Sequence, residues 1–463
     1  MLSPTIGLLP LYIALYDDAL PELRYAFDDF RTEVEAGFAR QGIEVVAAPI
    51  CRVRSEFAAA LEAFRRAAVD GIVTLHLAYS PSLESCALLA AMPQPILMLD
   101  VTPDAAFGRD VDPQRLLYNH GIHGVQDLAA MLRRMKKDYH VIAGHLSDPS
   151  VMRRAGEFAR GAKAAGALAV TRALRVGPSF SGMGDFAVEP DVLRRRLGIA
   201  VEEIALEALE ADVVAVPEAD VAAEMARDLA AYDADVPAAV HARSARLGLG
   251  LRRYLERGGY SAFSMNFLAF DRAEGPLSTV PFLECCKAMA RGIGYAGEGD
   301  VLTAALVGAL AAGFGDTSFT EMFCPDWAGG TVFLSHMGEC NPAIAAGRPR
   351  LYEKEYPFTA AQNPAALACA PRPGPATLVN LSPGPDETFR LIITPVELLD
   401  DGTHPDLVNA VRGWFRPPMP TAAFLEAYSQ LGGTHHCALT LGHHVEGMLA
   451  FARQAGMEGC VIE

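Results

Sequence analysis

The first third of the chain alternates short apolar runs with longer segments whose apolar positions recur every three or four residues. The short runs have the length of buried strands and occur at Thr5–Leu9, Ile43–Ile50, Gly71–His76, Ile96–Leu99 and His140–Leu146. The clearest helical stripe follows Pro21 and consists of Leu23, Phe27, Phe30, Val34 and Phe38. Continuous apolar strands that alternate with helices predict a parallel sheet covered on both faces, with ligands bound at the carboxyl ends of the strands.

The pattern changes beyond about residue 170. A glycine-rich turn at residues 177–184 precedes a stretch from Asp191 to Gly258 that we expect to be mostly helical. Farther on, Ala376–Leu381 and Thr388–Pro395 are rich in β-branched residues and are separated by a Ser-Pro-Gly-Pro turn. This pattern predicts a hairpin within an antiparallel, barrel-like domain.

The length of 463 residues corresponds to about three domains of ordinary size. We expect an α/β protein with an N-terminal α/β domain at residues 1–172 and a middle α/β domain at residues 173–331, both built on Rossmann-like parallel sheets. Residues 332–463 are expected to form a C-terminal domain with an antiparallel β-barrel-like sheet.

Composition and charge narrow the function. Hydrophobic residues make up 51% of the chain, which is enough for a large core and excludes global disorder. The net charge of −17 opposes binding to nucleic acid or to an anionic membrane surface. The longest apolar run, Val301 to Gly315, is shorter than the roughly 20 residues that span a bilayer. No Lys or Arg precedes Arg24, so a secretory signal is not expected and we predict a cytoplasmic protein.

The cysteines and a glycine motif suggest structural roles. Nine cysteines are scattered without a CxxC pair, which predicts buried free thiols in a reducing compartment. Residues 292–297 match GxGxxG, but the preceding segment reads as helix and no acidic residue lies between Asp300 and Asp316. Nucleotide binding therefore lacks its usual context. A tight turn that positions Glu298 and Asp300 is the better interpretation.

Two carboxylates and a histidine pair are the candidate metal ligands. Glu321 and Glu339 are isolated acids in apolar surroundings, and a buried carboxylate needs a cation or a proton unless it stays at the surface. His435 and His436 follow two glycines, and on an extended segment their side chains would point to opposite sides, so that one could bind a metal. These residue types favour manganese or magnesium over zinc.

These segments resemble the L-arabinose isomerase family within the arabinose/fucose isomerase superfamily. The resemblance rests on Tyr-Ala-Gly-Glu-Gly-Asp at residues 295–300, Thr-Ser-Phe-Thr-Glu at 317–321, Ser-His-Met-Gly-Glu at 335–339 and Gly-Gly-Thr-His-His at 432–436. Weaker similarity extends from Ile6 through residues 119–124 to the turn near Met183, so the resemblance covers nearly the whole chain.

The resemblance implies a metal-dependent aldose–ketose isomerase that works through an enediol. By position, Glu321, Glu339 and His436 match manganese ligands, and the two glutamates match the proton-transfer pair; Mg²⁺ and Co²⁺ are alternative ions. The positions that would contact the sugar substrate are Leu11, Tyr12, His120, His123, Met183, Tyr295 and His435. The family also implies a homo-oligomer, hexameric or trimeric, with sugar pockets shared between subunits.

The chain departs from the family pattern at three positions. Glu355 stands where the family has a fourth metal ligand, a histidine, and Glu353 is the other acid close to that place. Leu9 and His120 replace two glutamines that contact the sugar, and losing an amide removes hydrogen bonds on which discrimination depends. We therefore expect a substrate other than L-arabinose. Two alternatives stay open: an impaired sugar-binding or assembly homologue, and a metal-dependent epimerase or decarboxylase of a sugar acid.

Overall fold

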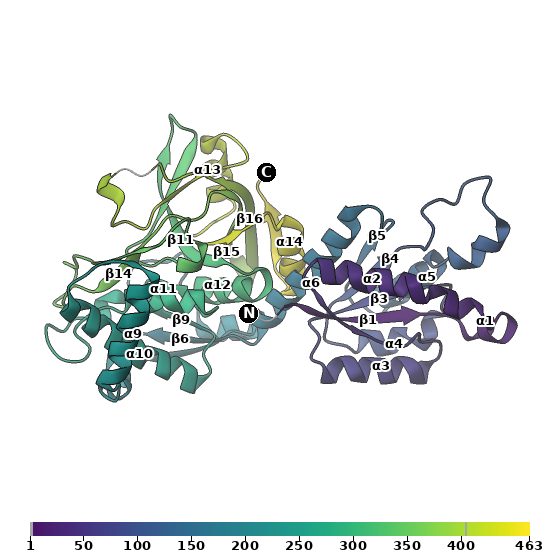
Figure 1. Ribbon diagram of the computed structural model, residues 1–463, viewed down its shortest axis with the longest axis horizontal. Coiled ribbons are helices and arrows are strands. Elements are labelled where there is room, and N and C mark those ends of the chain that lie inside the picture. Colours follow the sequence, from purple (N-terminus) through teal and green to yellow (C-terminus); the bar gives the residue numbers. More distant parts are fainter. Residues whose placement is uncertain (1–2, 403–404) are drawn as a thin grey trace. The chain divides into compact units, whose positions relative to one another are not determined.

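The structure is a computed structural model that describes residues 3–402 and 405–463 (Figure 1). The chain divides after Lys163 into two units, each with its own hydrophobic core. This division lies near the domain boundary predicted at residue 172. The boundary predicted between residues 331 and 332 falls within the second unit and stays a prediction.

A parallel sheet with the strand order β2–β1–β3–β4–β5 forms the centre of the first unit. Its strands are β1 (Thr5–Leu11), β2 (Glu44–Ala47), β3 (Gly71–His76), β4 (Ile96–Asp100) and β5 (Tyr139–Ala143). Its helices are α1 (Ala14–Ala19), α2 (Asp28–Arg40), α3 (Arg54–Arg66), α4 (Cys86–Ala90), α5 (Ile122–Arg134) and the first part of α6 (Pro149–Ala169). Figure 1 shows α2 on the opposite face of this sheet from α3 and α4. The central strands are buried on both faces, which is why they appear in the sequence as unbroken apolar runs.

The apolar stripe after Pro21 does not form the single helix that its period predicts. A 3₁₀ helix at Leu23–Phe27 comes first, and α2 starts anew at Asp28. Asp28 and Asp29 lie in the first turn of α2, where their charges stabilise a helix start. The apolar side chains of the stripe are nevertheless buried as expected.

A second parallel sheet, in the order β10–β9–β6–β7, begins the second unit. Its strands are β6 (Arg172–Val176), β7 (Ala200–Ile204), β9 (Ala262–Met265) and β10 (Gly294–Ala296). The helices around it are α7 (Pro190–Leu197), α8 (Glu210–Val214), α9 (Glu218–Ala231), α10 (Ala238–Gly258), α11 (Phe282–Ala290) and α12 (Val301–Phe314). The stretch expected to be mostly helical thus contains β7, an edge strand. Its exposed Glu202 and Glu203 break the apolar run by which the other strands were found.

The rest of the second unit contains a closed antiparallel barrel in the order β15–β18–β11–β12–β17–β16, with β19 added alongside β16. The strands are β11 (Thr317–Asp326), β12 (Thr331–Ser335), β15 (Gly374–Pro383), β16 (Phe389–Leu398), β17 (Gly413–Arg416), β18 (His436–Leu441) and β19 (Glu458–Val461). A small sheet joins β8 (Asp233–Asp235), β13 (Arg350–Glu353) and β14 (Ala365–Ala368), and the remaining helices are α13 (Thr421–Gln430) and α14 (Val445–Gln454). The predicted hairpin is β15–β16, and the predicted fold class is confirmed.

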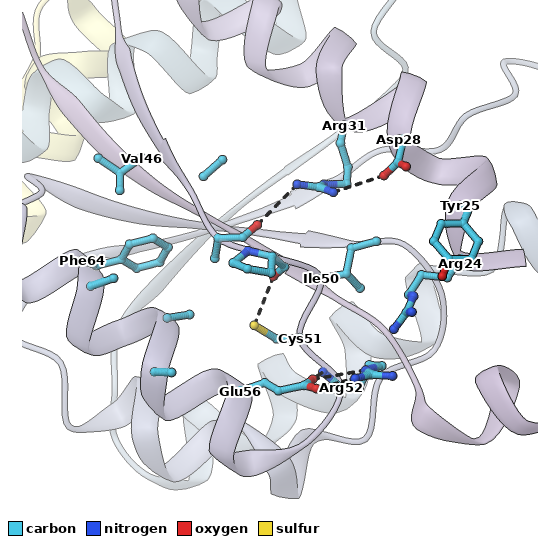
Figure 2. A pocket seen from close by; sticks show the side chains of 16 residues that line it. Arg24, Tyr25, Asp28, Arg31, Val46, Ile50, Cys51, Arg52, Glu56 and Phe64 are labelled. Carbon is cyan, nitrogen blue, oxygen red and sulfur yellow. Dashed lines mark hydrogen bonds and ion pairs between the residues drawn. The ribbon is translucent and has the colours of Figure 1, made fainter. Parts of the chain in front are cut away.

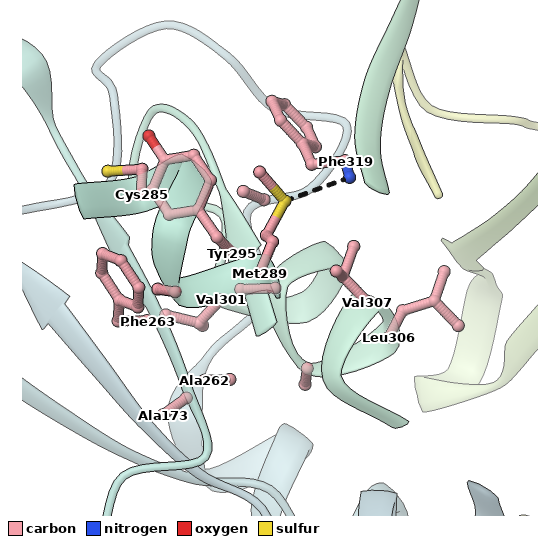
Figure 3. Close-up of a cluster of buried hydrophobic side chains, with 14 of the residues drawn as sticks. Ala173, Ala262, Phe263, Cys285, Met289, Tyr295, Val301, Leu306, Val307 and Phe319 are labelled. Atoms are coloured by element: carbon pink, nitrogen blue, oxygen red, sulfur yellow. Dashed lines mark hydrogen bonds between the residues drawn. The ribbon is translucent and has the colours of Figure 1, made fainter. Parts of the chain in front are cut away.

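The helix α12 joins the parallel sheet to the barrel. It contacts β9 and β10 on one side and β11 and β18 on the other, so apolar residues cover its whole circumference. Figure 3 shows Val301, Leu306 and Val307 of α12 in one buried cluster with Phe263 and Phe319. No helix among the described residues is long and apolar enough to cross a membrane.

Candidate active site

The glycine motif after α11 ends in a turn that carries two acids of the site. The backbone leaves β10, turns at Gly297-Glu298-Gly299 and enters α12 at Asp300. Glu298 has a φ of +63° and Gly299 a φ of +81°, both in the left-handed region. A Cβ at Gly299 would lie 2.8 Å from the Cα of Ser179, so only glycine fits there. The predicted tight turn at Glu298 and Asp300 is confirmed.

Glu321 and His436 face each other across two barrel strands. They are register partners on the antiparallel strands β11 and β18. Nε2 of His436 lies 3.0 Å from Oε1 of Glu321 and 3.4 Å from Oε2 of Glu298. His436 is fully buried, and its ring stacks on Phe186 at 4.9 Å between centroids.

A candidate metal centre consists of Glu298, Glu321, His435 and His436. One ligand atom from each of these four residues lies within 4.8 Å of the others. Nδ1 of His435 contacts Asp185 at 2.7 Å and Nδ1 of His436 contacts Asp300 at 2.9 Å. A carboxylate on one imidazole nitrogen is the usual second shell of a metal-binding histidine, because it orients the other nitrogen toward the ion.

Two buried atoms of this group suit a cation. Oε2 of Glu298 and Nε2 of His436 are shielded from solvent, and neither makes a hydrogen bond of good geometry with a described residue; they contact each other at 3.4 Å, and Nε2 of His436 contacts Glu321 at 3.0 Å. An unpaired buried polar atom costs free energy unless something absent from the polypeptide binds it. Carboxylate oxygens and imidazole nitrogens form the donor set that a manganese-type ion prefers. The residues present therefore fit a divalent metal.

The electrostatics of the site without a cation point the same way. Burial opposes the charged form of Glu298, but the imidazoles of His435 and His436, whose Nε2 atoms lie 3.6 and 3.4 Å from Oε2, lower its pKa to about 2. Burial likewise opposes ionisation of Glu321, yet His336 and His436 hold its pKa below the ordinary range. Positive charge on the imidazoles compensates the negative charge of the two carboxylates, and a bound metal ion would supply that positive charge instead.

Glu339 lies beside this group but is separated from it by His336. Nδ1 of His336 contacts Oε2 of Glu339 at 2.7 Å, and its Nε2 lies 3.1 Å from Oε1 of Glu321. The hydroxyl of Tyr295 donates to Oε1 of Glu339 over 2.8 Å. These three contacts join residues of the family motifs. His336 was not predicted as a site residue, although its place three residues before Glu339 in the same motif could have pointed to it.

A small apolar cavity opens onto this arrangement. Glu298, His336, Glu339 and Tyr295 contribute its polar and aromatic wall. The other lining side chains are apolar or aromatic: Met265, Phe267, Phe282, Met337 and Tyr356. The cavity measures only about 10 Å³, which is room for roughly one water molecule, so this wall by itself does not enclose a sugar.

A larger cavity, of about 600 Å³, lies in the first unit between α2, α3 and the end of β2 (Figure 2). Three arginines line it, but three acids pair with them: Arg24 pairs with Asp17, Arg52 with Asp17 and Glu56, and Arg31 with Asp28. Their charges are therefore compensated within the protein. Nothing in this cavity resembles the donor set of the site in the second unit.

The sequence matches the family models of L-arabinose isomerase along nearly its whole length. The N-terminal domain model matches residues 31–169, the central domain model residues 188–313, and the C-terminal domain model residues 316–458. The chain belongs to the L-arabinose isomerase family. The enzyme class expected from the motifs, an intramolecular oxidoreductase of the sugar isomerase type, is thereby confirmed.

Curated relatives agree with this assignment. L-arabinose isomerase from Nocardioides sp. is 30% identical over 424 residues, which cover 87% of this chain and 84% of that protein. The enzyme from Shouchella clausii is 30% identical over 423 residues, with coverage of 87% and 84%. L-arabinose isomerase from Escherichia coli is 29% identical over 412 residues, with coverage of 85% and 80%.

The structure places four predicted sugar contacts of this isomerase at the carboxyl end of the first sheet. Leu11 ends β1 and Tyr12 follows it; both are buried, and the hydroxyl of Tyr12 has no hydrogen-bond partner within the described ranges. Nε2 of His120 lies 3.1 Å from the hydroxyl of Tyr16, and His123 is exposed next to it. The carboxyl end of a parallel sheet is where ligands are expected.

The remaining predicted contacts lie in the second unit. Tyr295 and His435 belong to the arrangement around the candidate metal centre, and Met183 is a half-buried residue in the glycine-rich turn. Asp185, two residues after Met183, accepts from both the backbone N–H and Nδ1 of His435. Asp185 is thus a site residue that the sequence analysis missed.

The acids expected to replace the fourth metal ligand lie outside the four-residue group. Glu355 follows β13 and is exposed, whereas Glu353 accepts a hydrogen bond from Asn363 at 3.0 Å. Between them, Lys354 points inward, and its aliphatic chain packs over Gly338 next to Glu339. Neighbouring side chains on an extended backbone face opposite sides, so Lys354 faces inward while Glu353 and Glu355 face the other way.

Proposed function

We propose that the protein is a metal-dependent aldose–ketose isomerase that acts on an open-chain sugar or sugar derivative other than L-arabinose. One observation carries the proposal: a four-residue oxygen and nitrogen donor set lies beside Glu339, a further carboxylate held by Tyr295 and His336. An aldose–ketose isomerase needs this combination, because it must polarise two neighbouring oxygens and move a proton between two carbons.

The residues divide the chemistry between them. The proposed metal ligands are the four that the family resemblance implies: Glu321, Glu339, His436 and Glu355. Two of them, Glu321 and His436, are in direct contact. A bound Mn²⁺, with Mg²⁺ or Co²⁺ as alternatives, would supply Lewis acidity at the substrate O1 and O2 and so acidify the C2 proton. One glutamate takes the proton from C2 and returns it to C1, while the other carries the hydroxyl proton, so that the enediol collapses to the ketose. Tyr295 and His336 keep Glu339 oriented for this transfer.

The proposed substrate differs from L-arabinose because two amides are absent at the first sheet. Leu9 is fully buried and offers no hydrogen bond, and His120 already contacts Tyr16. A site that loses a side-chain amide loses discrimination among hydroxyl configurations.

A sugar acid is the second candidate substrate class, and one residue favours it. The side chain of Lys354 is half-buried, and its ammonium group interacts electrostatically with Glu339. A cation beside the reacting groups could bind a carboxylate and support epimerisation or decarboxylation of a sugar acid. Screening aldoses, ketoses and sugar acids with Mn²⁺ present, on the protein and on its Lys354→Met variant, separates the two classes.

Metal removal tests the proposed function. We expect dialysis against EDTA to abolish turnover and added Mn²⁺ to restore it, because the site has no other Lewis acid for the two substrate oxygens. The measurements are metal content by mass spectrometry and turnover on the best substrate of the screen. A purified protein that binds no divalent ion and stays inactive with Mn²⁺ would instead be the impaired sugar-binding or assembly homologue.

We also propose a homo-oligomer, hexameric or trimeric and located in the cytoplasm, in which Leu11, Tyr12, His120 and His123 complete the site of a neighbouring subunit. Large apolar side chains that are exposed in the segments after β1, β3 and β4 support an interface there: Leu15, Leu20, Tyr25, Leu83, Phe107 and Leu116. Exposed apolar surface of this kind is what a contact with another protein would cover.

Mixed oligomers test this sharing. His123→Ala and Glu321→Gln should each be nearly inactive, but hybrids made by co-expression should regain activity, because some sites then combine intact residues from both chains. Turnover is compared with that of the two variants mixed without subunit exchange, and oligomer mass is followed by light scattering. Activity in a fully monomeric fraction at the wild-type rate would show that the site is not shared.

A further inference from the structure

We propose that Cys340 and Cys369 are a modification site: a small hydroperoxide oxidises the two thiols to a disulfide, which displaces Glu339 and lowers the activity of the neighbouring site reversibly. The inference rests on the proposed function only in taking Glu339 as one of the reacting groups. The joining of the two thiols does not depend on that function.

Three thiols, those of Cys286, Cys340 and Cys369, belong to one buried cluster of the second unit. Sγ of Cys369 contacts Sγ of Cys340 at 3.1 Å, and the backbone N–H of Cys340 donates to Sγ of Cys286 over 3.3 Å. A disulfide places its two sulfurs about 2 Å apart, so the sulfurs of Cys340 and Cys369 need to come only about 1 Å closer. The pair is therefore placed for oxidation.

The two cysteines come from segments that are distant in the sequence. Cys340 lies in the segment after β12, and Cys369 directly follows β14. A thiol in contact with a second thiol has a resolving partner at hand, which is the arrangement of redox-sensitive cysteines. In a reducing compartment, a disulfide of this kind is transient and regulatory rather than structural.

A small cavity lets an oxidant reach the pair. Both cysteines line it, together with side chains that include Phe319, Val411 and Arg412, and its volume is about 20 Å³. This is slightly more than a water molecule needs, so hydrogen peroxide fits, whereas a bulky disulfide such as oxidised glutathione does not. The cavity therefore restricts the oxidant to small hydroperoxides.

The proposed oxidation balances in atoms and electrons. Cys369 loses its proton and attacks one oxygen of the peroxide; the O–O bond breaks, hydroxide leaves and takes up that proton, and Cys369 becomes a sulfenic acid. The sulfur of Cys340 then attacks the sulfenic sulfur, the S–O bond breaks, and the departing hydroxide takes the thiol proton of Cys340. Two thiols lose two electrons in total, and the peroxide becomes two water molecules.

The thiol cluster holds the backbone on both sides of Glu339. Cys340 is the next residue, and the thiol of Cys286 donates to the carbonyl of Gly338 over 3.4 Å. The backbone at Gly338 is closely packed, since a Cβ there would lie 3.3 Å from the Cβ of Ala366. Close packing transmits a displacement instead of absorbing it. A disulfide that pulls on Cys340 therefore moves Glu339.

The experiment oxidises the full-length protein with hydrogen peroxide. The protein carries Cys324→Ser, which removes an exposed thiol outside the cluster. After catalase has destroyed the peroxide, mass spectrometry of unreduced peptides identifies the linked cysteines, and turnover is measured with Mn²⁺ before and after dithiothreitol. We expect a disulfide between Cys340 and Cys369, a loss of turnover of at least about tenfold, and full recovery on reduction, because a misplacement of about 1 Å costs a reacting group about 10²-fold.

Cys369→Ser in the same background is the matched control. It should turn over at the untreated rate both before and after peroxide, because one of the two sulfurs is missing. Cys369→Ala takes its place should the serine variant fold poorly by circular dichroism. Oxidised glutathione, applied for the same time, should leave the pair reduced, and a disulfide formed by it would overturn the route through the cavity.

The outcomes separate this inference from the proposed function. If no disulfide forms, or if Cys340 is linked to Cys286 instead, the inference is overturned and the isomerase function stands. If the expected disulfide forms without a loss of turnover, or if Cys369→Ser is inactivated equally by peroxide, the control of Glu339 by the pair is overturned. If the untreated protein turns over no sugar, the proposed function fails, and the peptide analysis still decides whether the two thiols join.

Discussion

Glu321→Gln and Glu339→Gln are each expected to lower turnover by a factor of about 10²–10⁴, the usual contribution of general acid–base catalysis. Glu321 contacts His436 and His336 at about 3 Å, so its amide variant loses a proton acceptor and a charged metal-ligand oxygen together. Glu339 is almost fully buried, with both oxygens held in place, so its variant loses a proton acceptor that is already oriented. Turnover is measured on the best substrate of the screen with saturating Mn²⁺.

The controls for these two variants concern folding. Glutamine is nearly isosteric with glutamate, so thermal unfolding should show that both proteins remain folded. Glu397→Gln, on an exposed side chain of β16 that the site does not use, gives the background effect of removing an acid. Retention of more than about a tenth of the wild-type rate by either site variant would remove that residue from the proton-transfer pair.

Much of the architecture could be predicted because burial leaves a direct trace in the sequence. The strand predicted at Gly71–His76 is found with the same bounds, since every one of its side chains is buried. The edge strand β7 was missed for the opposite reason, because Glu202 and Glu203 face solvent. Likewise, the period of an apolar stripe could not reveal that the backbone changes from a 3₁₀ helix to α2 at Asp28.

The site was predictable only in part. Glu321 and His436 lie together because their strands pair in register. A motif shared with a family can suggest that the two residues meet, but the periodicity of apolar residues cannot. Glu298 was placed on a tight turn, but an acid on a turn looks the same in sequence whether it faces solvent or a metal. The long-range partners Asp185 and Asp300 become visible only when the turn after β6 and the start of α12 meet the histidine pair.

The expectation that the two neighbouring histidines point to opposite sides is wrong. Their ring centroids are 4.2 Å apart, and both Nε2 atoms approach Glu298. The extended strand begins only at His436. His435 precedes it, and Asp185 binds both its backbone N–H and its Nδ1, which turns the ring toward its neighbour. Direction therefore does not separate the roles of the two residues, but burial and contacts do.

His436→Ala is expected to lose bound metal, whereas His435→Ala should keep the metal and lose substrate affinity or rate. His436 is fully buried, is oriented by Asp300 and reaches Glu321, so its removal leaves a hole at the centre of the group. The side chain of His435 is 41% exposed and lies farther from Glu298, in a position to donate to a substrate hydroxyl. Metal content after dialysis and steady-state kinetics of both variants are the measurements.

His443→Ala is the matched control for this pair, because that ring contacts only the carbonyl of Val396 among the contacts described and should change neither metal content nor rate. His436→Gln provides a less disruptive variant in which a polar side chain still fills the cavity, and it should also lose metal. Equal metal loss in the His435 and His436 variants would make both residues ligands, since both belong to the four-residue group. Metal loss in His435→Ala alone would reverse the assignment, and His435 would then be the ligand with His436 as its buried support.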